Sequence, residues 1–226
     1  MKNKKKTVLI FAAHPDDDIL GCGGTIAKFV KQGLKIHVVF LSEGESSREG
    51  ILNIDNLIKE RKQNAKKALK ILGCTSIEFL DFPDNRLDSI DLLNVVKKVE
   101  YYIDIYKPST VLTHYAYDLN IDHQVTHKAV VTACRPQPSC PVKELLFFEI
   151  PSSTEWNLSN AFMPNYYVDI SETLFLKKKA LKIYKNEMRS FPHPRSIQAI
   201  ENLSNYRGSS VGCKAAEAFL IGYKIK

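Results

Sequence analysis

A histidine followed by three carboxylates stands near the start of the chain, in His14-Pro15-Asp16-Asp17-Asp18. Three adjacent negative charges repel one another, so the arrangement costs stability unless something compensates for it. A solvated helix N-cap is one explanation, because aspartate is a favoured cap residue. A bound divalent cation is the other, because it would offset the repulsion and use the imidazole. Histidine with aspartate is a combination typical of first-row transition metals, with zinc the default.

His123 and His127 form a second candidate pair near the middle of the chain. They are four residues apart in a segment that predicts a helix, so both side chains lie on roughly one face of it. Such a pair can chelate one metal ion, although the intervening residues lack the glutamate of the metalloprotease His-Glu-x-x-His motif. On its own the pair is as easily a structural coincidence. Together with the segment that begins at His14, the metal interpretation is favoured.

The segment that begins at His14 follows an apolar run over residues 7–13, TVLIFAA, that predicts a buried strand. Pro15 fixes its own φ and biases His14 toward extended geometry, so the turn after the strand is stiff. The next apolar pattern predicts a helix, and the aspartates lie at its amino end, where the helix dipole favours negative charge. Open α/β sheets place ligands at the carboxyl ends of strands, so this position also supports a binding site.

Predicted strands and helices alternate with short connections through the first half of the chain, which is typical of a parallel, doubly wound sheet. The second half predicts further strands, a long helix capped by Ser171, a rigid turn around His193 and a final helix. We expect one α/β domain over residues 1–226, with a Rossmann-like, mostly parallel sheet, helices on both faces and the metal site at the carboxyl ends of the strands. The expected strands are 7–13, 35–42, 77–82, 110–115, 144–150 and 166–170, and the expected helices include 54–72, 88–106 and 171–188.

The composition limits the class of protein. Hydrophobic residues make up 44% of the 226 residues and charged residues 25%, which is ordinary for a soluble globular protein. No apolar run approaches the roughly 20 residues that a membrane-spanning helix needs. The lysine-rich start lacks the apolar core and cleavage site of a signal peptide, so we expect a cytoplasmic location. The five cysteines lack Cys-x-x-Cys spacing, which argues against a disulfide framework and against a cysteine-based zinc site.

The chain is basic, with a formal net charge of +7 and a pI near 9.0. A basic surface suggests an anionic partner, such as nucleic acid, a membrane surface or an anionic substrate. The lysine runs lack interleaved aromatic residues and are typical of solvated helix faces, so we do not expect nucleic-acid binding. No Gly-x-Gly-x-x-Gly follows the first strand, which excludes a dinucleotide-binding oxidoreductase. The oligomeric state stays open, with a homo-oligomer as one outcome.

The segment His14-Pro15-Asp16-Asp17-Asp18 resembles the Ala-His-Pro-Asp-Asp-Glu motif of the PIG-L/LmbE family, the zinc-dependent de-N-acetylases of N-acetylglucosaminyl conjugates. The resemblance covers nearly the whole chain, and the motif is specific because it stands in a strand–turn–helix context. Further segments that resemble the family are 61–73, 82–84, 118–123, 192–196 and 208–219.

The resemblance implies roles for individual residues. His14, Asp17 and His123 match the zinc ligands of the family, and Asp16 matches its general base. This assignment makes chemical sense, because three protein ligands leave an open position on zinc and a carboxylate outside the ligand set can accept the proton of an attacking water. Another divalent transition metal would suit the same ligands.

Two positions depart from the family pattern. Asp18 stands where glutamate is usual, and its shorter side chain can still cap the helix or support a ligand. Asn120 stands where many members have the histidine that is proposed to protonate the leaving amine, and asparagine cannot donate a proton at neutral pH. His193, between two prolines, is our candidate for the proton donor, although a surface turn histidine is as common. His127 and Asp16 itself are the alternatives.

Arg61 and Arg86 follow the second and third strands and could bind substrate hydroxyls, phosphate or acetate. A solvated or structural ion pair is an equal alternative for each. The favoured function is a zinc hydrolase that removes acetyl from an N-acetylglucosamine-type conjugate, with an anionic or lipid-like aglycone. The alternatives are a related amidase or amide-bond lyase, and a binding protein that has lost turnover. A nucleic-acid-binding module has only the net charge in its favour.

Overall fold

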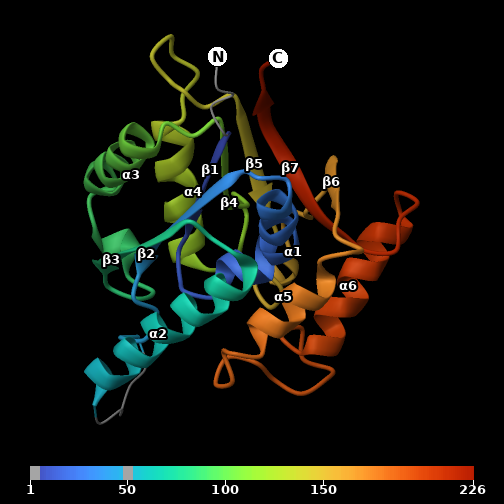
Figure 1. Cartoon of the computed structure of the whole chain (residues 1–226). Helices are drawn as coiled ribbons and strands as arrows, with labels where there is room; N and C mark the ends of the chain where they lie inside the picture. The colour runs from blue at the N-terminus through green and yellow to red at the C-terminus, as the bar shows by residue number, and fades with distance from the viewer. Residues whose placement is uncertain (1–5, 48–52) are drawn as a thin grey trace.

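The computed structural model describes residues 6–47 and 53–226 (Figure 1). The strands are β1 (Thr7–Ala12), β2 (Lys35–Ser42), β3 (Ser76–Phe82), β4 (Thr110–His114), β5 (Glu144–Phe148), β6 (Tyr166–Asp169) and β7 (Ala216–Lys224). The helices are α1 (Asp17–Lys31), α2 (Ile54–Leu72), α3 (Leu92–Tyr106), α4 (Ile121–Ala133), α5 (Leu174–Leu181) and α6 (Ile197–Ser209). Two short 3-10 helices are η1 (Leu87–Ser89) and η2 (Thr154–Trp156).

These strands form one sheet in the order β3-β2-β1-β4-β5-β7-β6. The strands from β3 to β5 run parallel, and β7 is antiparallel to both β5 and β6. The chain moves outward from β1 to β3 on one side and then crosses back to β4, so the strand order reverses between β1 and β4. Doubly wound sheets bind ligands at this reversal, outside the carboxyl ends of the strands. The fold class predicted from the sequence is confirmed.

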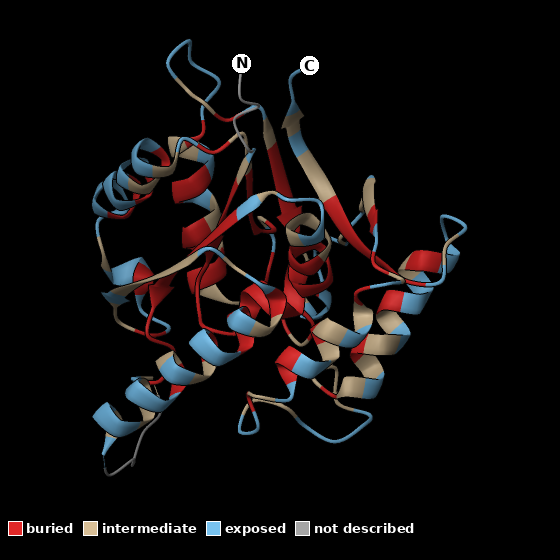
Figure 2. Ribbon diagram, in the orientation of Figure 1, coloured by how far each residue is buried: buried red, intermediate tan, exposed pale blue. Residues whose placement is uncertain are grey.

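Alternate side chains of β1 enter two different cores, one on each face of the sheet. Val8 and Ile10 pack into the core covered by α1, α2 and α5, whereas Leu9 and Phe11 pack into the core covered by α3 and α4. Figure 2 shows the buried residues concentrated in the central strands and on the inner sides of the helices. A parallel strand that is buried on both faces is expected to be apolar throughout, which explains the continuous TVLIFA run.

Helix α1 is broken at Cys22, whose φ is −146°. The break leaves backbone groups without helical partners, and two distant side chains satisfy them. The Lys177 ammonium donates to the Leu20 carbonyl at 2.8 Å, and the Glu217 carboxylate accepts from the backbone N–H groups of Gly24 and Thr25 at 2.9 and 2.6 Å. The part of α1 before the break, which carries the aspartates, is therefore tied to α5, and the part after the break is tied to β7.

Two of the predicted helices have wrong bounds. The helix predicted over 88–106 starts at Leu92, after the separate turn η1. The helix predicted over 171–188 covers only Leu174–Leu181, and its N-cap is Thr173 rather than Ser171. The Ser171 hydroxyl instead donates to Asp169 Oδ1 at 2.5 Å. Beyond α5 the chain bends toward α2, where Glu187 pairs with Arg61, and this contact is incompatible with a longer helix.

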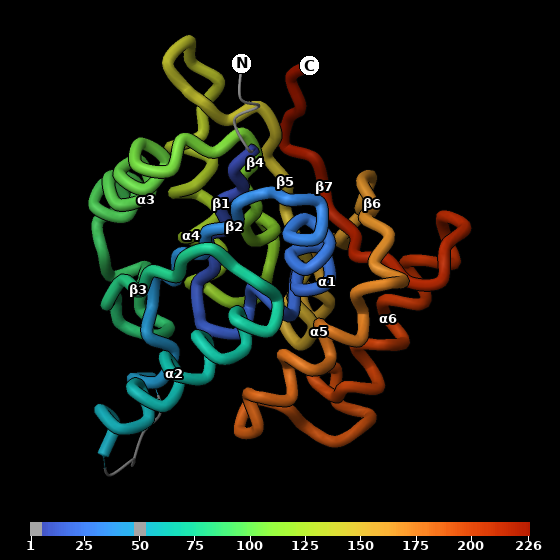
Figure 3. The backbone as a smooth tube through the Cα atoms, viewed as in Figure 1, coloured from blue at the N-terminus to red at the C-terminus, as the bar shows by residue number. Residues whose placement is uncertain are grey.

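Three segments, which can be followed along the chain in Figure 3, contact one another through side chains. They are the turn between β1 and α1, residues 149–156 after β5, and the α5–α6 connection, residues 182–196. Arg195 of this connection contacts Asp16 in the first segment and Ser152 in the second. Within residues 6–47 and 53–226, no helix is long and apolar enough to span a membrane.

Candidate metal centre

His14, Asp17 and His123 come together at the reversal of strand order and are all buried. His14 Nδ1 lies 3.2 Å from Asp17 Oδ2, and His123 Nε2 lies 3.2 Å from the same oxygen. Ligands placed about 2.0–2.1 Å from a tetrahedral zinc ion are roughly 3.3 Å apart, so these separations fit a zinc ligand set. Among the described residues His123 Nε2 and Asp17 Oδ1 have no hydrogen-bond partner although both are buried. The three residues could therefore hold a metal ion.

The outward-facing nitrogens of the two imidazoles contact carboxylates. His14 Nε2 lies 3.0 Å from Asp122 Oδ2 and 3.1 Å from Asp84 Oδ1. His123 Nδ1 lies 3.0 Å from Asp118 Oδ1. Metal-binding histidines commonly make this contact, because it fixes the ring orientation and leaves the other nitrogen for the metal. Both histidines therefore have the environment of a metal ligand.

Further hydrogen bonds hold these carboxylates in place. Asp122 accepts from the backbone N–H groups of Asn85 at 2.7 Å and Leu87 at 2.9 Å. Asp118 accepts from the hydroxyls of Ser153 and Thr154, with the latter bond 2.6 Å long. The histidine orientations thus depend on η1 and on the segment after β5.

Asn120 has a structural role in this part of the site. Its side-chain oxygen caps α4, accepting from the backbone N–H of Asp122 at 2.8 Å and of His123 at 3.3 Å. Its amide donates to Asn85 Oδ1 at 2.9 Å. Asparagine is among the best N-cap residues, so this position favours the start of α4 and with it the placement of His123.

The electrostatics of the site favour positive charge between the aspartates. Burial on its own would raise the pKa of Asp17, but the imidazoles of His123 and His14 hold it well below its usual range. Burial on its own would lower the pKa of His123, but Asp17 and Asp118 raise it to about 9. The carboxylates thus attract a cation, whether protons on the imidazoles or a metal ion between them.

Asp16 lies beside the three candidate ligands but its carboxylate contacts two arginines. Asp16 Oδ1 is 3.3 Å from Arg61 Nη2, and Oδ2 is 3.3 Å from Arg195 Nη1. Burial raises the pKa of Asp16 to about 6, against the opposing effect of both guanidiniums. Its φ of 132° is strained for a residue with a side chain, and such strain is concentrated at functional sites.

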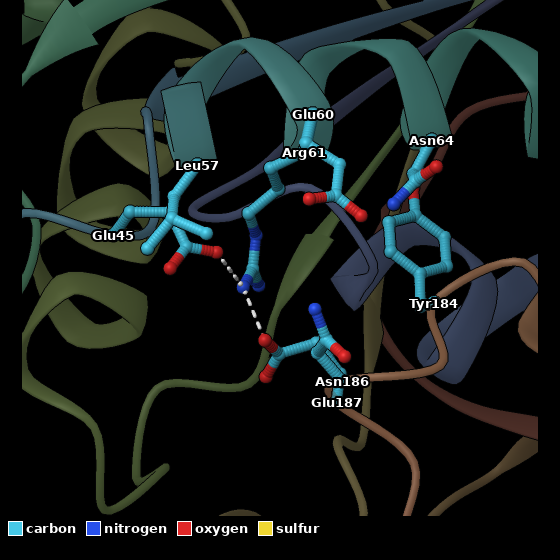
Figure 4. A pocket seen from close by; sticks show the side chains of 8 residues that line it. All are labelled: Glu45, Leu57, Glu60, Arg61, Asn64, Tyr184, Asn186 and Glu187. Atoms are coloured by element: carbon cyan, nitrogen blue, oxygen red, sulfur yellow. Dashed lines mark hydrogen bonds and ion pairs between the residues drawn. The ribbon is translucent and has the colours of Figure 1, made fainter. Parts of the chain in front are cut away.

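Arg61 is buried and projects from α2 toward Glu45 and Glu187 (Figure 4). Its Nη1 pairs with Glu45 Oε1 at 2.9 Å and with Glu187 Oε1 at 2.8 Å, and its Nε donates to the Pro15 carbonyl at 3.2 Å. The guanidinium therefore joins the β1–α1 turn to the α5–α6 connection. These contacts favour a role in holding Asp16, and substrate binding by Arg61 stays a prediction.

The other predicted residues lie around this centre. Arg86 is exposed just before η1. The Nδ1 atom of His193 accepts from the backbone N–H of Arg195 at 3.0 Å, and its ring centroid is 6.1 Å from that of Trp156. His127 points away from the ligand set, with Nδ1 2.9 Å from the His114 carbonyl oxygen. Of the predicted histidines, His14 and His123 are brought together, and His193 reaches Asp16 only by way of Arg195.

The sequence did not single out Arg195 or His114 as site residues. The His114 ring stacks on that of His123, with centroids 4.0 Å apart, and its Nε2 accepts from the Ala13 backbone N–H at 2.8 Å. Burial lowers the pKa of His114 well below its usual value, so the ring is neutral. A histidine as the last residue of a buried strand was the available signal for His114. Nothing in the local sequence indicates that Arg195 reaches Asp16.

Comparison with known proteins gives consistent relatives. The model of one family, described as "PIG-L: GlcNAc-PI de-N-acetylase", matches residues 9–134. "Uncharacterized deacetylase YaiS" of Escherichia coli is 33% identical over 81% of this chain and 93% of that protein. "Diacetylchitobiose deacetylase" of Thermococcus kodakarensis is 26% identical over 95% of this chain and 82% of its own.

Two further matches are a solved structure and a relative that is named for a different reaction. The crystal structure of the conserved protein TT1542 from Thermus thermophilus superposes with a TM-score of 0.79 at 25% identity, covering 97% of this chain and 96% of that one. "4-oxalmesaconate hydratase" of Pseudomonas putida is 33% identical over 54% of this chain and 49% of that protein. The matched proteins thus include a hydratase as well as deacetylases, and the reaction has to be argued from the site.

Proposed function

Because the chain belongs to the PIG-L family of GlcNAc-PI de-N-acetylases, we propose that it is a metal-dependent hydrolase that removes the acetyl group from an N-acetylglucosamine-type sugar conjugate. The observation that carries this proposal is a buried group of two histidines and one aspartate beside a second aspartate, Asp16, that is not part of the group. This arrangement supplies ligands for a metal ion and a separate proton acceptor, which are the two needs of metal-assisted amide hydrolysis.

We propose zinc as the metal, since two imidazoles and one carboxylate are a common set of ligands in catalytic zinc sites. Other divalent transition metals would suit the same donors. His14, Asp17 and His123 would hold the ion, and Asp122 and Asp118 would orient the two imidazoles. Once bound, zinc supplies Lewis acidity, which lowers the pKa of water and polarises an amide carbonyl.

Asp16 is proposed as the general base. Its two oxygens contact Arg61 and Arg195, which keep the carboxylate in place and favour its ionised form. A carboxylate whose pKa is raised to about 6 by burial is still ionised at neutral pH and is a stronger base than an exposed one. Asp16 would therefore take the proton of the water that attacks the acetyl carbonyl.

His193 is proposed as the donor of a proton to the leaving amine. The donor form would be the imidazolium, which carries protons on both nitrogens, so protonation of the ring would break the hydrogen bond that Nδ1 accepts from the Arg195 backbone N–H. Asp16 is the alternative, since it can pass on the proton that it has accepted. Replacing His193 by glutamine separates the two. Loss of the alkaline limb of the pH profile, with unchanged zinc content, supports His193, whereas an unaltered limb assigns both steps to Asp16.

The two predicted substrate-binding arginines have different surroundings. Arg61 is buried among three carboxylates, so its contribution is to keep Asp16 in position, and direct contact with substrate is the weaker proposal. Arg86 is exposed at the carboxyl end of β3 and would reach a hydroxyl or an anionic group of the aglycone. A rise in KM without loss of kcat for Arg86→Ala would support that role.

Acetate release tests the proposed function directly. The purified, zinc-loaded protein is incubated with N-acetylglucosamine, N,N′-diacetylchitobiose and anionic N-acetylglucosaminides, and both acetate and the new primary amine are quantified. Equal amounts of the two products support the deacetylase. No product from these substrates, together with release of amine from an amide conjugate that has no acetyl group, would indicate a different amide bond. Tight binding of a conjugate with no product of either kind would indicate a binding protein that has lost turnover.

A further inference from the structure

Trp156 is the only tryptophan in the chain, and 46% of its surface is exposed. It ends η2, in the segment that follows the carboxyl end of β5. Burying a large aromatic ring is strongly favourable, and a ring left half exposed beside a candidate active site is available for a ligand. The mechanism proposed above makes no use of it.

The segment that carries Trp156 is fixed by hydrogen bonds to the metal centre. Ser153 and Thr154 donate their hydroxyls to Asp118, whose Oδ1 lies 3.0 Å from His123 Nδ1. The Thr154 hydroxyl oxygen also accepts from the backbone N–H of Ile150 at 2.8 Å. The indole therefore stands on a rigid segment, so holding it against a ligand costs little conformational entropy.

A second set of contacts places the indole on one side of the centre. The rings of Trp156 and His193 meet edge to face, with centroids 6.1 Å apart and an interplanar angle of 83°. His193 accepts from the backbone of Arg195, and Arg195 contacts Asp16. His193 is the proposed proton donor to the leaving amine, and in an N-acetylated sugar that amine is attached to the sugar ring. With His193 in that role, the indole would lie on the sugar side of the amide.

We propose that Trp156 is a stacking platform for a pyranose ring on the sugar side of the bond that is cleaved. A pyranose presents C–H groups on its faces and hydroxyls around its edge, so it needs an aromatic face in polar surroundings. Trp156 meets this need, because its neighbours are the imidazole of His193 and the polar residues of the 152–155 segment. An alkyl aglycone would instead need aliphatic contacts, for which the fully exposed Leu158 is available two residues away. The proposal deepens the proposed function and rests on it.

The single tryptophan makes the platform observable without catalysis. Zinc-loaded protein with Asp16→Asn, which should slow turnover strongly, is titrated with N,N′-diacetylchitobiose while tryptophan emission is recorded. We expect a saturable change with the disaccharide and none with sodium acetate. In the same background Trp156→Ala should weaken disaccharide binding roughly tenfold by calorimetry, and Trp156→Phe should keep most of it. Tyr206→Ala, which removes an aromatic residue that is 64% exposed on α6, is the matched control and should bind as the parent does.

With wild-type Asp16, Trp156→Ala should raise KM for the disaccharide by a similar factor with kcat and zinc content unchanged. Unaltered binding in Trp156→Ala would overturn the platform. The platform would also be overturned if octyl glucoside bound more tightly than the disaccharide and Leu158→Ala weakened the binding of octyl glucoside. Failure of the proposed function has a different signature, since sugar binding through Trp156 would then persist without acetate release. Conversely, acetate release without sugar binding through Trp156 would support the proposed function and reject the stacking platform.

Discussion

The metal ligands and the surroundings of Asp16 are fixed by different parts of the structure. His14 follows β1, whereas Asp17 and His123 lie in the first turns of α1 and α4, the second of which is capped by Asn120. The contacts of Asp16 instead depend on Arg195, which is 179 residues away in sequence and belongs to the irregular α5–α6 connection. The ends of regular elements therefore place the candidate metal ligands, whereas the packing of an irregular connection builds the environment of the proposed base.

This difference suggests that metal binding and proton transfer are separable. Changes in the ligand-bearing turns should remove the metal and therefore all activity. Changes in the α5–α6 connection should leave the metal in place and alter how activity depends on pH. Variants from the two regions test whether the division holds.

The largest loss of metal and of activity is expected when a candidate metal ligand is replaced. His14→Ala, Asp17→Ala and His123→Ala should each lose stoichiometric metal, and acetate release should fall to background, because two remaining ligands rarely retain the ion. Elemental analysis of the purified variants measures the occupancy. His37→Ala is the control, since this buried histidine lies in β2 with its Nδ1 2.7 Å from Ser76 Oγ. Full zinc occupancy in the three ligand variants would reject the ligand assignment.

A smaller effect is expected for Arg195→Gln, in the other region. The change removes a positive charge 3.3 Å from Asp16 Oδ2, so the pKa of Asp16 should rise. Because activity needs the ionised carboxylate and is lost as the pH falls through this pKa, the acidic limb of kcat/KM should move to higher pH. Arg195→Lys keeps the positive charge, so it should shift the acidic limb of kcat/KM less than Arg195→Gln does.

Zinc content measured alongside the pH profiles sharpens this test. Equal occupancy in Arg195→Gln and wild type is expected if the two regions are separable. Loss of zinc from Arg195→Gln, or a profile that does not move, would show that the α5–α6 connection acts on the metal ligands rather than on Asp16.

The smallest effect is expected from the helix caps. Asn120→Ala and Ser196→Ala remove the N-caps of α4 and α6, and each should lower the free energy of unfolding by about 1 kcal/mol. Only Asn120 also positions His123, so only its variant should bind zinc more weakly. Urea unfolding of the metal-free proteins and zinc competition assays measure the two quantities. Equal zinc affinity in both variants would restrict Asn120 to capping.

The sequence predicted the locally determined features well. Apolar runs bounded by glycine or proline predicted β2 and α2 with the bounds that the structure has. The candidate ligands were predictable because they lie in the turns or first helical turns that follow β1 and β4, and parallel strands bring their carboxyl ends to one edge of the sheet. His14, Asp17 and His123 do meet there, although their role as ligands stays a prediction.

Features determined by tertiary contacts could not be read in the same way. The pattern over 171–188 is helical, but the chain leaves the helix after Leu181 and brings Glu187 to Arg61. Arg195 lies in the same turn as His193, yet its contact with Asp16 depends on how that connection packs. Long-range contacts of this kind have no periodic signature in the sequence, so they were missed.

The central claim is that Asp16 acts on protons beside a metal ion that it does not bind, and Asp16→Asn tests it most directly. The substitution keeps the shape of the side chain and removes the proton acceptor. The measurement is kcat for acetate release together with zinc content of the same preparation. We predict full zinc content with kcat lowered by roughly 10²–10⁴-fold. Near wild-type kcat, or loss of zinc from the variant, would contradict the account.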